Sequence, residues 1–486
     1  MTINNNVAFI LSPNFHSSYT NFMDKPTIIL ATSNGIGMGH LTRASAIASE
    51  LKEFSNPIIV SMAAGVIEVP KIAGVRFEYI PGRDRNWMGR FQWDSYLRDR
   101  LVALIDETDA KIISFDGVVP YPGIIAIKSK RPEVKLVWVR RGFWQKTPQK
   151  YLLALQSRMM DLIITPGDFG QSYDKGPTSK RNDSVLVNPI SIFDSKSTFS
   201  REQAREELGL DKNRPACLVQ LGIGEADLNS KLTAALSGLL GWKNLQVVLT
   251  KEPVDSNGKN LAPAGLDINI IRYFPLAKVL NAFDAAICAA GYNSVHEELA
   301  AKIPTLFVPN IRGTDNQSDR AKWAFDNQMA LTVDQNNLED IENNAKKLQD
   351  EDLRNKLSRN CNKLPSTTGG SEVAKIFKNL LVAPTKTGIS LPITLISLKI
   401  RDIFARGLKG FVYSLLQLLT VVYRWIKPHN KGKVSYSNKL EIYENEESDV
   451  LRKLIKSGKP FEHLIVNASP AYKNRRVEIA SKAYLK

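Results

Sequence analysis

Residues 288–317 read CAAGYNSVHEELAAKIPTLFVPNIRGTDNQ, and this stretch is the most informative about the fold. A short apolar strand leads into a helix that opens after Gly291, and Pro304 begins the next strand. Backbone N–H groups at the start of such a helix attract anions. Glu297, about one turn further along, can accept hydrogen bonds from both hydroxyls of a ribose. The pattern predicts an open α/β sheet that binds its ligand at the carboxyl edge of the strands, where Asp315 falls.

Short apolar runs alternate with helix-length amphipathic stretches from Pro26 onward, which predicts parallel sheets with helical crossovers. Two such series begin with a strand and a glycine turn, at Gly35–Gly39 and at Gly222–Gly224. We therefore expect two Rossmann-like, doubly wound α/β domains. The expected segments are a polar leader (1–25), an N-terminal domain (26–190), a C-terminal domain (191–385) and a basic, partly apolar extension (386–486). The first sheet is expected to contain Thr27–Ala31, Pro57–Ser61, Lys111–Phe115, Lys135–Arg140 and Leu162–Thr165.

The polar stretch Pro177 to Phe199 is interpreted as the connection between the domains. After it, Ser200 is predicted to cap a helix that stops at Gly209. The last helix of the two-domain core is expected at Ser371–Leu381.

The loop after the first strand, NGIGMGHLTR, combines Gly37 and Gly39 with His40. Glycines without a Cβ permit close approach of an anion or of a substrate. The spacing departs from the dinucleotide fingerprint GxGxxG, and no clear acidic residue closes the next strand, so a dehydrogenase is disfavoured. A tight turn without a ligand is the alternative for this loop.

The three cysteines, Cys217, Cys288 and Cys361, are far apart and show no metal-binding spacing. They favour a reducing compartment and argue against a disulfide framework and a zinc site. The net charge is +16, and residues 391–486 hold 18 Lys or Arg against 8 Asp or Glu, a net +10. Most of the positive charge therefore lies in the extension.

The pattern G-Y-N-S-V-x-E, then Pro304, then Asp315 and Gln317 resembles the donor box of the GT-B nucleotide-sugar glycosyltransferases. It is similar to the plant UDP-glucosyltransferases and to the bacterial transferases that add N-acetylglucosamine to the lipid-linked peptidoglycan precursor. The resemblance covers roughly Pro26 to Leu381. It implies that the two domains face each other across a cleft, with Gly37 and Gly39 on the loop that lines it opposite the donor. Ala289 stands where the plant box has histidine, and Asn316 separates Asp from Gln, so the identity of the sugar stays open.

The resemblance implies a UDP-sugar as co-substrate, with no further cofactor and no metal. It places the diphosphate at the helix start, the ribose on one carboxylate, the sugar on the strand-end loop and the base near the aromatic residue of IIRYFP. The implied donor-binding residues are Gly222, Gly224, Phe274, Gly291, Asn293, Ser294, Glu297, Asp315 and Gln317.

In inverting enzymes of this family, a base takes the proton from the acceptor hydroxyl while the diphosphate leaves. His40 suits that role, and Asp116, directly after an apolar strand, could orient it. An Asp that only forms a turn before Gly117 is the alternative for the carboxylate. His296 precedes Glu297 on a helix and is expected to be structural.

Three functions remain open at this point. The first is a glycosyltransferase acting on a glycan or lipid-linked acceptor at the cytoplasmic membrane face. The second is a nucleotide-sugar hydrolase, because GMGHLTR is similar to the G-x-G-H-x-x-R loop of hydrolases that cleave UDP from nonulosonic acid precursors; His40 would then activate water. The third, less favoured, is a non-catalytic subunit.

The segment Gly407–Lys427 holds an uncharged core of about 14 residues, which is shorter than the roughly 20 that a spanning helix needs. Basic residues flank it, so residues 399–433 are expected either to lie on an anionic membrane surface or to pack on the domains. The loop Pro81–Trp93 mixes arginines with aromatics, and fits either an acceptor surface or aromatics tucked into the core. No nucleic-acid motif accompanies these charges, so no nucleic-acid partner is expected. We expect a cytoplasmic protein, peripheral on the inner face of the membrane.

Overall fold

The computed structural model describes the two-domain core and parts of the C-terminal extension. The described residues are 25–33, 38–63, 73–80, 82–83, 90–145, 150–222, 227–250, 263, 265–271, 273–310, 314–334, 336–385, 391–404, 439–443, 461–467 and 476–483.

The first domain is built on a seven-stranded sheet with the order β3-β2-β1-β4-β5-β6-β7, and its strand pairs are parallel. The strands predicted for this domain are all present, and their ends differ by a single residue at most. Sequence reasoning did not identify β3, and it assigned the run that forms β7 to the interdomain connection. Both are short strands at the edges of the sheet. The strands are β1 (Thr27–Thr32), β2 (Asn56–Ser61), β3 (Arg76–Tyr79), β4 (Ile112–Asp116), β5 (Lys135–Val139), β6 (Leu162–Pro166) and β7 (Val185–Val187).

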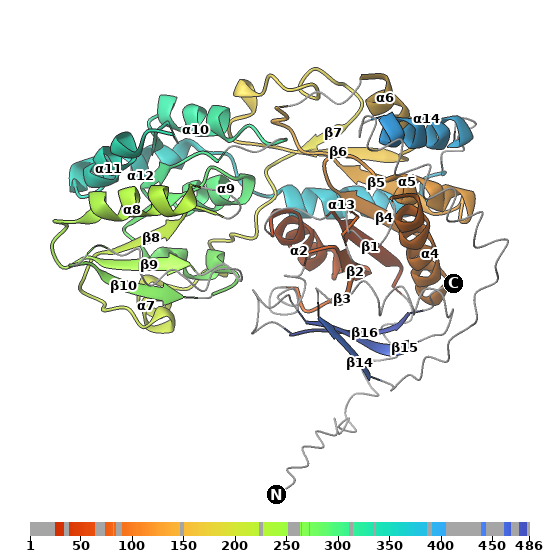
Figure 1. Cartoon of the computed structure of the whole chain (residues 1–486), viewed down its shortest axis with the longest axis horizontal. Coiled ribbons are helices and arrows are strands. Elements are labelled where there is room, and N and C mark those ends of the chain that lie inside the picture. Colours follow the sequence, from red (N-terminus) through yellow and green to blue (C-terminus); the bar gives the residue numbers. More distant parts are fainter. Residues whose placement is uncertain are drawn as a thin grey trace, which may run out of the picture.

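Helices cover both faces of this sheet (Figure 1). On one face, Ile47 of α2 and Phe377 of α13 pack with strand residues in one apolar cluster. On the other, Trp93 of α4 and Leu398 of α14 belong to a second cluster. Because both faces are buried, the strands are almost continuously apolar, as expected of a parallel sheet. The helices are α2 (Gly39–Leu51), α4 (Arg90–Thr108), α5 (Pro122–Ile125), α6 (Lys150–Arg158), α13 (Gly369–Val382) and α14 (Leu391–Phe404), with 3-10 turns η3 (Ala126–Ser129) and η4 (Gln171–Tyr173).

The second domain repeats the plan with a six-stranded parallel sheet in the order β10-β9-β8-β11-β12-β13. Its strands are β8 (Ala216–Gln220), β9 (Gln246–Thr250), β10 (Asp267–Ile271), β11 (Ala285–Cys288), β12 (Thr305–Phe307) and β13 (Ala330–Thr332). Its helices are α7 (Arg201–Leu208), α8 (Leu228–Leu239), α9 (Tyr292–Ala300), α10 (Gln317–Asp326), α11 (Leu338–Lys347) and α12 (Glu351–Asn360), with η6 (Leu276–Ala282) and η7 (Cys361–Lys363).

Helix α7 shows how local sequence sets an element's ends. Ser200 and Gln203 form a reciprocal capping box, and Gly209 ends the helix in the left-handed region at φ 64°. Both ends agree with the prediction. The box satisfies backbone donors that a helix start otherwise leaves free, and glycine adopts positive φ without a Cβ clash.

The chain returns to the first domain after completing the second. Helix α13 packs on α2, and the Lys135 ammonium donates to the carbonyls of Leu380 and Leu381 at its end. The last helix therefore crosses back to the first domain. Helix α14 then packs on α5 and α6. The extension predicted to begin at residue 386 thus contributes a helix to the core of the first domain.

Further along the extension, β14 (Lys439–Tyr443), β15 (Phe461–Asn467) and β16 (Arg476–Ala483) form a mixed three-stranded sheet. Strand β16 lies next to β3 (Figure 1). The leader (1–24) and the apolar segment 407–427 lie outside the described residues. Within the described part of the chain, no helix is both long and apolar enough to cross a membrane.

Candidate active site

The first sheet places two predicted catalytic residues beside one another. The strand order reverses direction at β1, so β1 and β4 are neighbours whose chains continue to opposite sides of the sheet. Ligands of open α/β sheets bind at such a switch point. Asp116 is the last residue of β4, and its carbonyl accepts the Ser33 N–H at 2.8 Å. His40 lies in the first turn of α2, which follows β1.

His40 and Asp116 form a hydrogen-bonded pair that Arg43 completes. His40 Nδ1 lies 2.7 Å from Asp116 Oδ1. Arg43 Nε donates to Asp116 Oδ2, and Arg43 Nη2 donates to Asp116 Oδ1, each at 2.6 Å. Because a carboxylate only accepts, Nδ1 must carry the proton, which leaves the Nε2 lone pair available for proton transfer.

The charges of this group follow from its burial. Burial acts to raise the pKa of Asp116, but Arg43 and His40 hold it at about 2, so the carboxylate stays ionised. Burial lowers the pKa of His40, and Arg43 and Arg141 lower it further, against the opposing effect of Asp116. The imidazole is therefore neutral near neutral pH, as a general base requires.

The glycine loop beside His40 contacts the second domain. Asn293 Nδ2 donates to the Gly39 carbonyl at 3.3 Å, and a Cβ on Gly39 would lie 3.9 Å from that nitrogen. Of the two glycines predicted to line the cleft, Gly39 thus lies at the domain interface. Gly37 lies outside the described residues.

The start of the predicted donor box lies at the same domain junction, because α9 packs on α2. Gly291 caps the start of α9 in an extended conformation, and Asn293 and Ser294 occupy its first turn, where backbone N–H groups have no helical acceptor. Gly222 follows β8 at φ 81°, which favours glycine, and Phe274 follows β10, so both lie after strands of the same sheet. Gly224 lies outside the described residues.

Glu297 is a half-buried carboxyl group on α9. Burial raises its pKa to about 8, no described residue forms a hydrogen bond or ion pair with its carboxyl group, and the buried Glu298 carboxyl beside it is a like-charged neighbour. A carboxylate in this situation is costly unless a ligand supplies donors. This environment fits a group that receives hydroxyls from a ligand.

Asp315 and Gln317 lie together, as the resemblance implies, but Asp315 is already engaged. Its Oδ1 lies 3.1 Å from Arg141 Nη1 and 3.1 Å from Arg320 Nη2, and its Oδ2 accepts from Gln317 Nε2 at 3.4 Å. Burial acts to raise the pKa of Asp315, but the two guanidinium groups hold it at about 2.

His296 is structural, as predicted. It is fully buried, its Nε2 accepts the Phe169 N–H at 3.0 Å, and its Nδ1 lies 2.5 Å from the Tyr292 carbonyl. The Tyr292 hydroxyl joins α9 to the end of the first domain. It donates to the Gly167 carbonyl at 2.8 Å and accepts the Ile190 N–H at 3.0 Å.

Sequence reasoning assigned no role to three arginines at this junction: Arg43, Arg141 and Arg320. Arg43 was visible in the motif H-L-T-R, one helical turn after His40. Arg141 had no local signal, because its partner Asp315 lies across the domain interface. Arg320 pairs with the nearby Asp315 and with Asp168, which is far away in the chain.

The loop predicted at Pro81–Trp93 is described only in part. Trp93 is fully buried and meets Tyr121 edge-on, and Arg83 pairs with Asp94 at 2.6 Å. These residues belong to the core, which favours that alternative for them. Trp87 lies outside the described residues.

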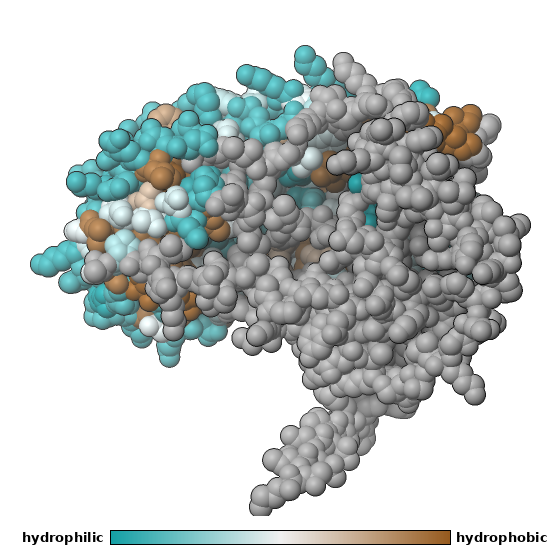
Figure 2. All heavy atoms as spheres, in the orientation of Figure 1, coloured by the Kyte–Doolittle hydropathy of each residue, from teal (hydrophilic) through white to brown (hydrophobic). Residues whose placement is uncertain are grey.

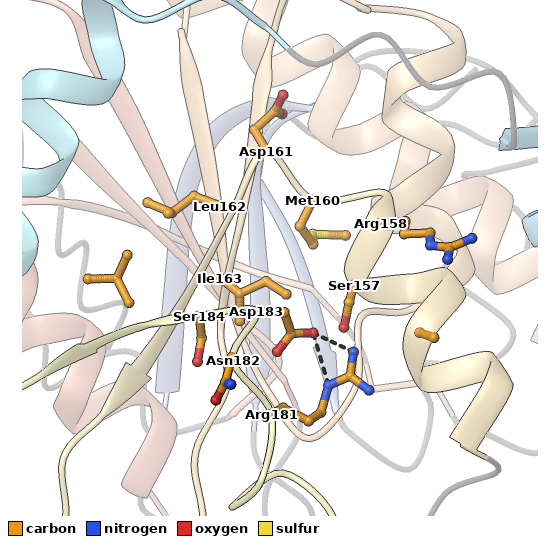
Figure 3. Close-up of a pocket in the computed structure, with 12 residues that line it drawn as sticks. Ser157, Arg158, Met160, Asp161, Leu162, Ile163, Arg181, Asn182, Asp183 and Ser184 are labelled. Carbon is orange, nitrogen blue, oxygen red and sulfur yellow. Dashed lines mark hydrogen bonds and ion pairs between the residues drawn. The ribbon is translucent and has the colours of Figure 1, made fainter.

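A separate pocket of about 570 Å³ lies between α6 and the starts of β6 and β7. Figure 3 shows the ion pair between Arg181 and Asp183 within it, in which Arg181 Nε donates to Asp183 Oδ2 at 2.9 Å. Arg140 also donates to Asp183, at 2.6 Å. None of the predicted site residues lines this pocket. No cluster of His, Cys, Asp or Glu suited to a metal ion occurs among the described residues.

The chain is similar to known proteins in sequence and in fold. Residues 226–380 match the glycosyltransferase family 28 C-terminal domain. Two curated relatives are both named UDP-N-acetylglucosamine--N-acetylmuramyl-(pentapeptide) pyrophosphoryl-undecaprenol N-acetylglucosamine transferase. The Acetivibrio thermocellus protein is 25% identical over 191 residues, which is 37% of this chain and 52% of the relative. The Rhodococcus opacus protein is 23% identical over 329 residues, 62% of this chain and 81% of the relative. The chain thus spans about half the length of the first of these relatives.

Two solved structures share the architecture at low identity. MurG from Acinetobacter baumannii is 19% identical with a TM-score of 0.50, over 73% of this chain and 99% of that one. UGT2 from Phytolacca americana, solved with UDP-2-fluoro-glucose and pterostilbene, is 14% identical with a TM-score of 0.53, over 74% and 98%. Identity at this level speaks for the fold alone. The chain therefore has the two-domain GT-B fold, and its residues 226–380 match the family 28 C-terminal domain.

Proposed function

We propose that this protein is an inverting glycosyltransferase that moves a sugar from a UDP-sugar to a glycan or lipid-linked acceptor. The observation that carries the proposal is the juxtaposition of a base and a donor box. The His40–Asp116 pair stands on the first domain, and the start of α9, with Asn293 against Gly39, faces it from the second.

In the proposed step, His40 Nε2 takes the proton of the acceptor hydroxyl. The acceptor oxygen bonds to the anomeric carbon, and the bond from that carbon to the diphosphate oxygen breaks, with its electron pair going to UDP. Because base and diphosphate lie on opposite walls of the cleft, attack comes from the face opposite the leaving group and inverts the anomeric centre. Asp116 fixes the imidazole tautomer and stabilises the imidazolium that forms.

The donor is proposed to lie along the second domain. The free N–H groups at the start of α9 receive the diphosphate, Glu297 the ribose hydroxyls, and Asp315 with Gln317 the sugar. Gly222, Gly224 and Phe274 complete the proposed donor site. No step of this proposal needs a metal ion or a further cofactor.

We also propose a lipid-linked acceptor and a location at the cytoplasmic membrane face. The names of the relatives specify a pyrophosphoryl-undecaprenol substrate for those proteins. In this chain, Ile393, Ile396 and Ile400 on α14 are 63%, 57% and 49% exposed, at helical spacing. The brown patch at the upper right of Figure 2 lies where Figure 1 places α14. An apolar helix face beside a basic segment suits an anionic lipid surface.

Vesicle binding tests the membrane proposal. We expect the triple variant I393Q/I396Q/I400Q to lose most of its co-sedimentation with phosphatidylglycerol vesicles, because it removes the apolar face without changing charge. L338Q, which alters an exposed leucine of the second domain, should sediment as the wild type does. Unchanged sedimentation of the triple variant would contradict a role for α14.

A hydrolase remains the second candidate, since the motif with His40 and Arg43 is similar to that of nucleotide-sugar hydrolases. Incubating the protein with a panel of UDP-sugars, with and without a membrane extract, separates the two. The transferase predicts UDP release that rises strongly when the extract supplies an acceptor. Fast release at the same rate without an acceptor would reject the transferase in favour of the hydrolase.

A further inference from the structure

Three guanidinium groups converge where the two domains meet. Arg43 comes from α2, Arg141 from the segment after β5, and Arg320 from α10. Their carboxylate partners are Asp116 for the first and Asp315 for the other two. A leaving diphosphate needs positive charge, so we asked which of the three cations could supply it.

Two of the arginines are fully committed to the protein. Arg43 makes two hydrogen bonds of 2.6 Å to Asp116, and its guanidinium lies 4.9 Å from the centre of the Tyr292 ring. Arg320 donates to Asp168 at 2.8 Å, to the Ala290 carbonyl at 2.9 Å and to Asp315 at 3.1 Å. Both side chains are about 1–2% exposed. Moving either would leave buried charges unpaired.

Arg141 is bound less completely. Its ion pair is a single 3.1 Å contact to Asp315 Oδ1, the oxygen that Arg320 also contacts. Its Nη2 donates to the Thr314 carbonyl at 3.2 Å and hydroxyl at 3.1 Å. Its Nε is buried and has no hydrogen-bond partner among the described residues. A buried donor without an acceptor is uncommon and costly, and it marks a place where a ligand could bind.

Arg141 also lies close to the proposed donor. A Cβ on Gly291, at the start of α9, would be 3.9 Å from Gln317 Nε2, and that nitrogen is 3.4 Å from Asp315 Oδ2. Arg141 contacts the other oxygen of the same carboxylate. The proposed diphosphate site and Arg141 are therefore connected through two side chains.

We propose that Arg141 is a further substrate-contacting residue, a cation from the acceptor domain that binds the donor diphosphate and stabilises it as it leaves. This inference rests on the proposed function. As the acceptor oxygen bonds to the anomeric carbon and His40 takes its proton, the bond to the diphosphate breaks and its electron pair goes to the β-phosphate oxygen. Arg141 then donates hydrogen bonds to the charge that develops there.

The donor itself supplies a reason for Arg141 to change partner. In the proposed mode, sugar hydroxyls donate to Asp315 and compete with its two cationic contacts, both of 3.1 Å. Arg320 keeps its bonds to Asp168 and Ala290, so Arg141 is the group that is released. Because Arg141 belongs to the first domain, transfer would be favoured only when the two domains enclose the donor.

Binding of UDP and of uridine to the variant R141M tests the inference. Uridine keeps the base and ribose but lacks the diphosphate. We expect R141M to lower the affinity for UDP about tenfold or more and to leave the affinity for uridine unchanged, because a charge-assisted hydrogen bond is lost only with UDP. R158M, which removes an exposed arginine of α6, is the matched control and should bind both as the wild type does.

Turnover provides a second readout. We expect R141A to lower kcat about 100-fold, R141K to retain an intermediate rate, and added guanidinium to restore part of the activity of R141A. A purely structural role would not predict rescue by a free cation.

Two outcomes separate this inference from the function on which it rests. If the wild type binds UDP and R141M binds it equally well, or if R141M loses uridine and UDP alike, Arg141 does not serve the diphosphate. If the wild-type protein binds neither UDP nor any UDP-sugar, the proposed function itself fails, and this inference with it.

Discussion

Two carboxyl groups of the cleft, Asp116 and Glu297, have opposite environments. Both are withdrawn from solvent, yet the pKa of Asp116 is held at about 2 while that of Glu297 is raised to about 8. The difference is their partners: Asp116 has Arg43 and His40, whereas Glu297 is raised by burial and has no described cationic partner, only the like-charged Glu298 carboxyl. Groups pushed apart in this way commonly have different tasks. Asp116 is suited to orient a base, and Glu297 is suited to receive a ligand.

The largest expected effect is that of breaking the paired carboxylate. We expect D116N to lower kcat at least 100-fold, because His40 loses the acceptor that fixes its tautomer. Stability should also fall, by about 3 kcal/mol, because Arg43 is left buried without a counter-charge. Steady-state kinetics and thermal unfolding measure the two effects.

The matched control is D183N. Asp183 also pairs with two arginines, Arg140 and Arg181, but it lies outside the cleft. The D183N variant should have a lower free energy of unfolding than the wild type and an unchanged kcat. If D183N and D116N reduce kcat alike, the loss in D116N reflects destabilisation and not catalysis.

The carboxyl group of Glu297 predicts that the affinity for uridine depends on pH. A ribose donates hydrogen bonds to the ionised form of Glu297, so affinity should rise with pH as the free group ionises toward its pKa of about 8. We expect uridine, which carries no titrating phosphate, to bind up to about 50-fold more tightly at pH 8 than at pH 6, because the ionised fraction of Glu297 rises from about 1% to about 50%. Calorimetry measures this directly, and E297Q should show no such rise. A flat profile for the wild type would remove Glu297 from the ribose site.

The smallest effect concerns stability. The folded pKa of Glu297 lies above its unfolded value of 4.5, so this group makes the protein less stable as pH rises from about 4.5 to about 8. E297Q removes that cost, and we expect it to stabilise the protein at pH 8 by on the order of 1 kcal/mol, or a few degrees in Tm. The gain should disappear at pH 4. Asp116 has the opposite sign: its contribution is present above about pH 4 and is lost as pH falls toward 2.

The His40–Asp116 pair and the arginine network around Asp315 differ in how far the sequence predicts them. The strands, the glycine turns and the position of α9 follow from local patterns, because apolar runs, caps and turn residues act within a few positions. His40 and Asp116 could be placed together because both follow strands of one parallel sheet. The arginine network around Asp315 could not, since Arg141 and Asp315 are distant in the chain and meet only across the domain interface.

Strand β7 and helix α14 are two further elements whose structural roles do not follow from the local sequence. Strand β7 is short and lies in a polar stretch, so its sequence resembles a linker. Helix α14 belongs to the extension by composition, yet Leu398 is fully buried in the first domain. Its exposed face carries Ile393, Ile396 and Ile400.

Measuring kcat and UDP affinity for H40A and E297Q side by side tests whether His40 is the base and Glu297 binds the ribose. If His40 is the base, H40A loses about 1,000-fold in kcat and keeps its affinity for UDP, because only proton removal is impaired. If Glu297 binds the ribose, E297Q binds UDP about tenfold more weakly and keeps most of its kcat at saturating donor. If both variants lose UDP affinity equally, or if H40A turns over at the wild-type rate, the assignment of base and ribose site to opposite walls of the cleft is wrong.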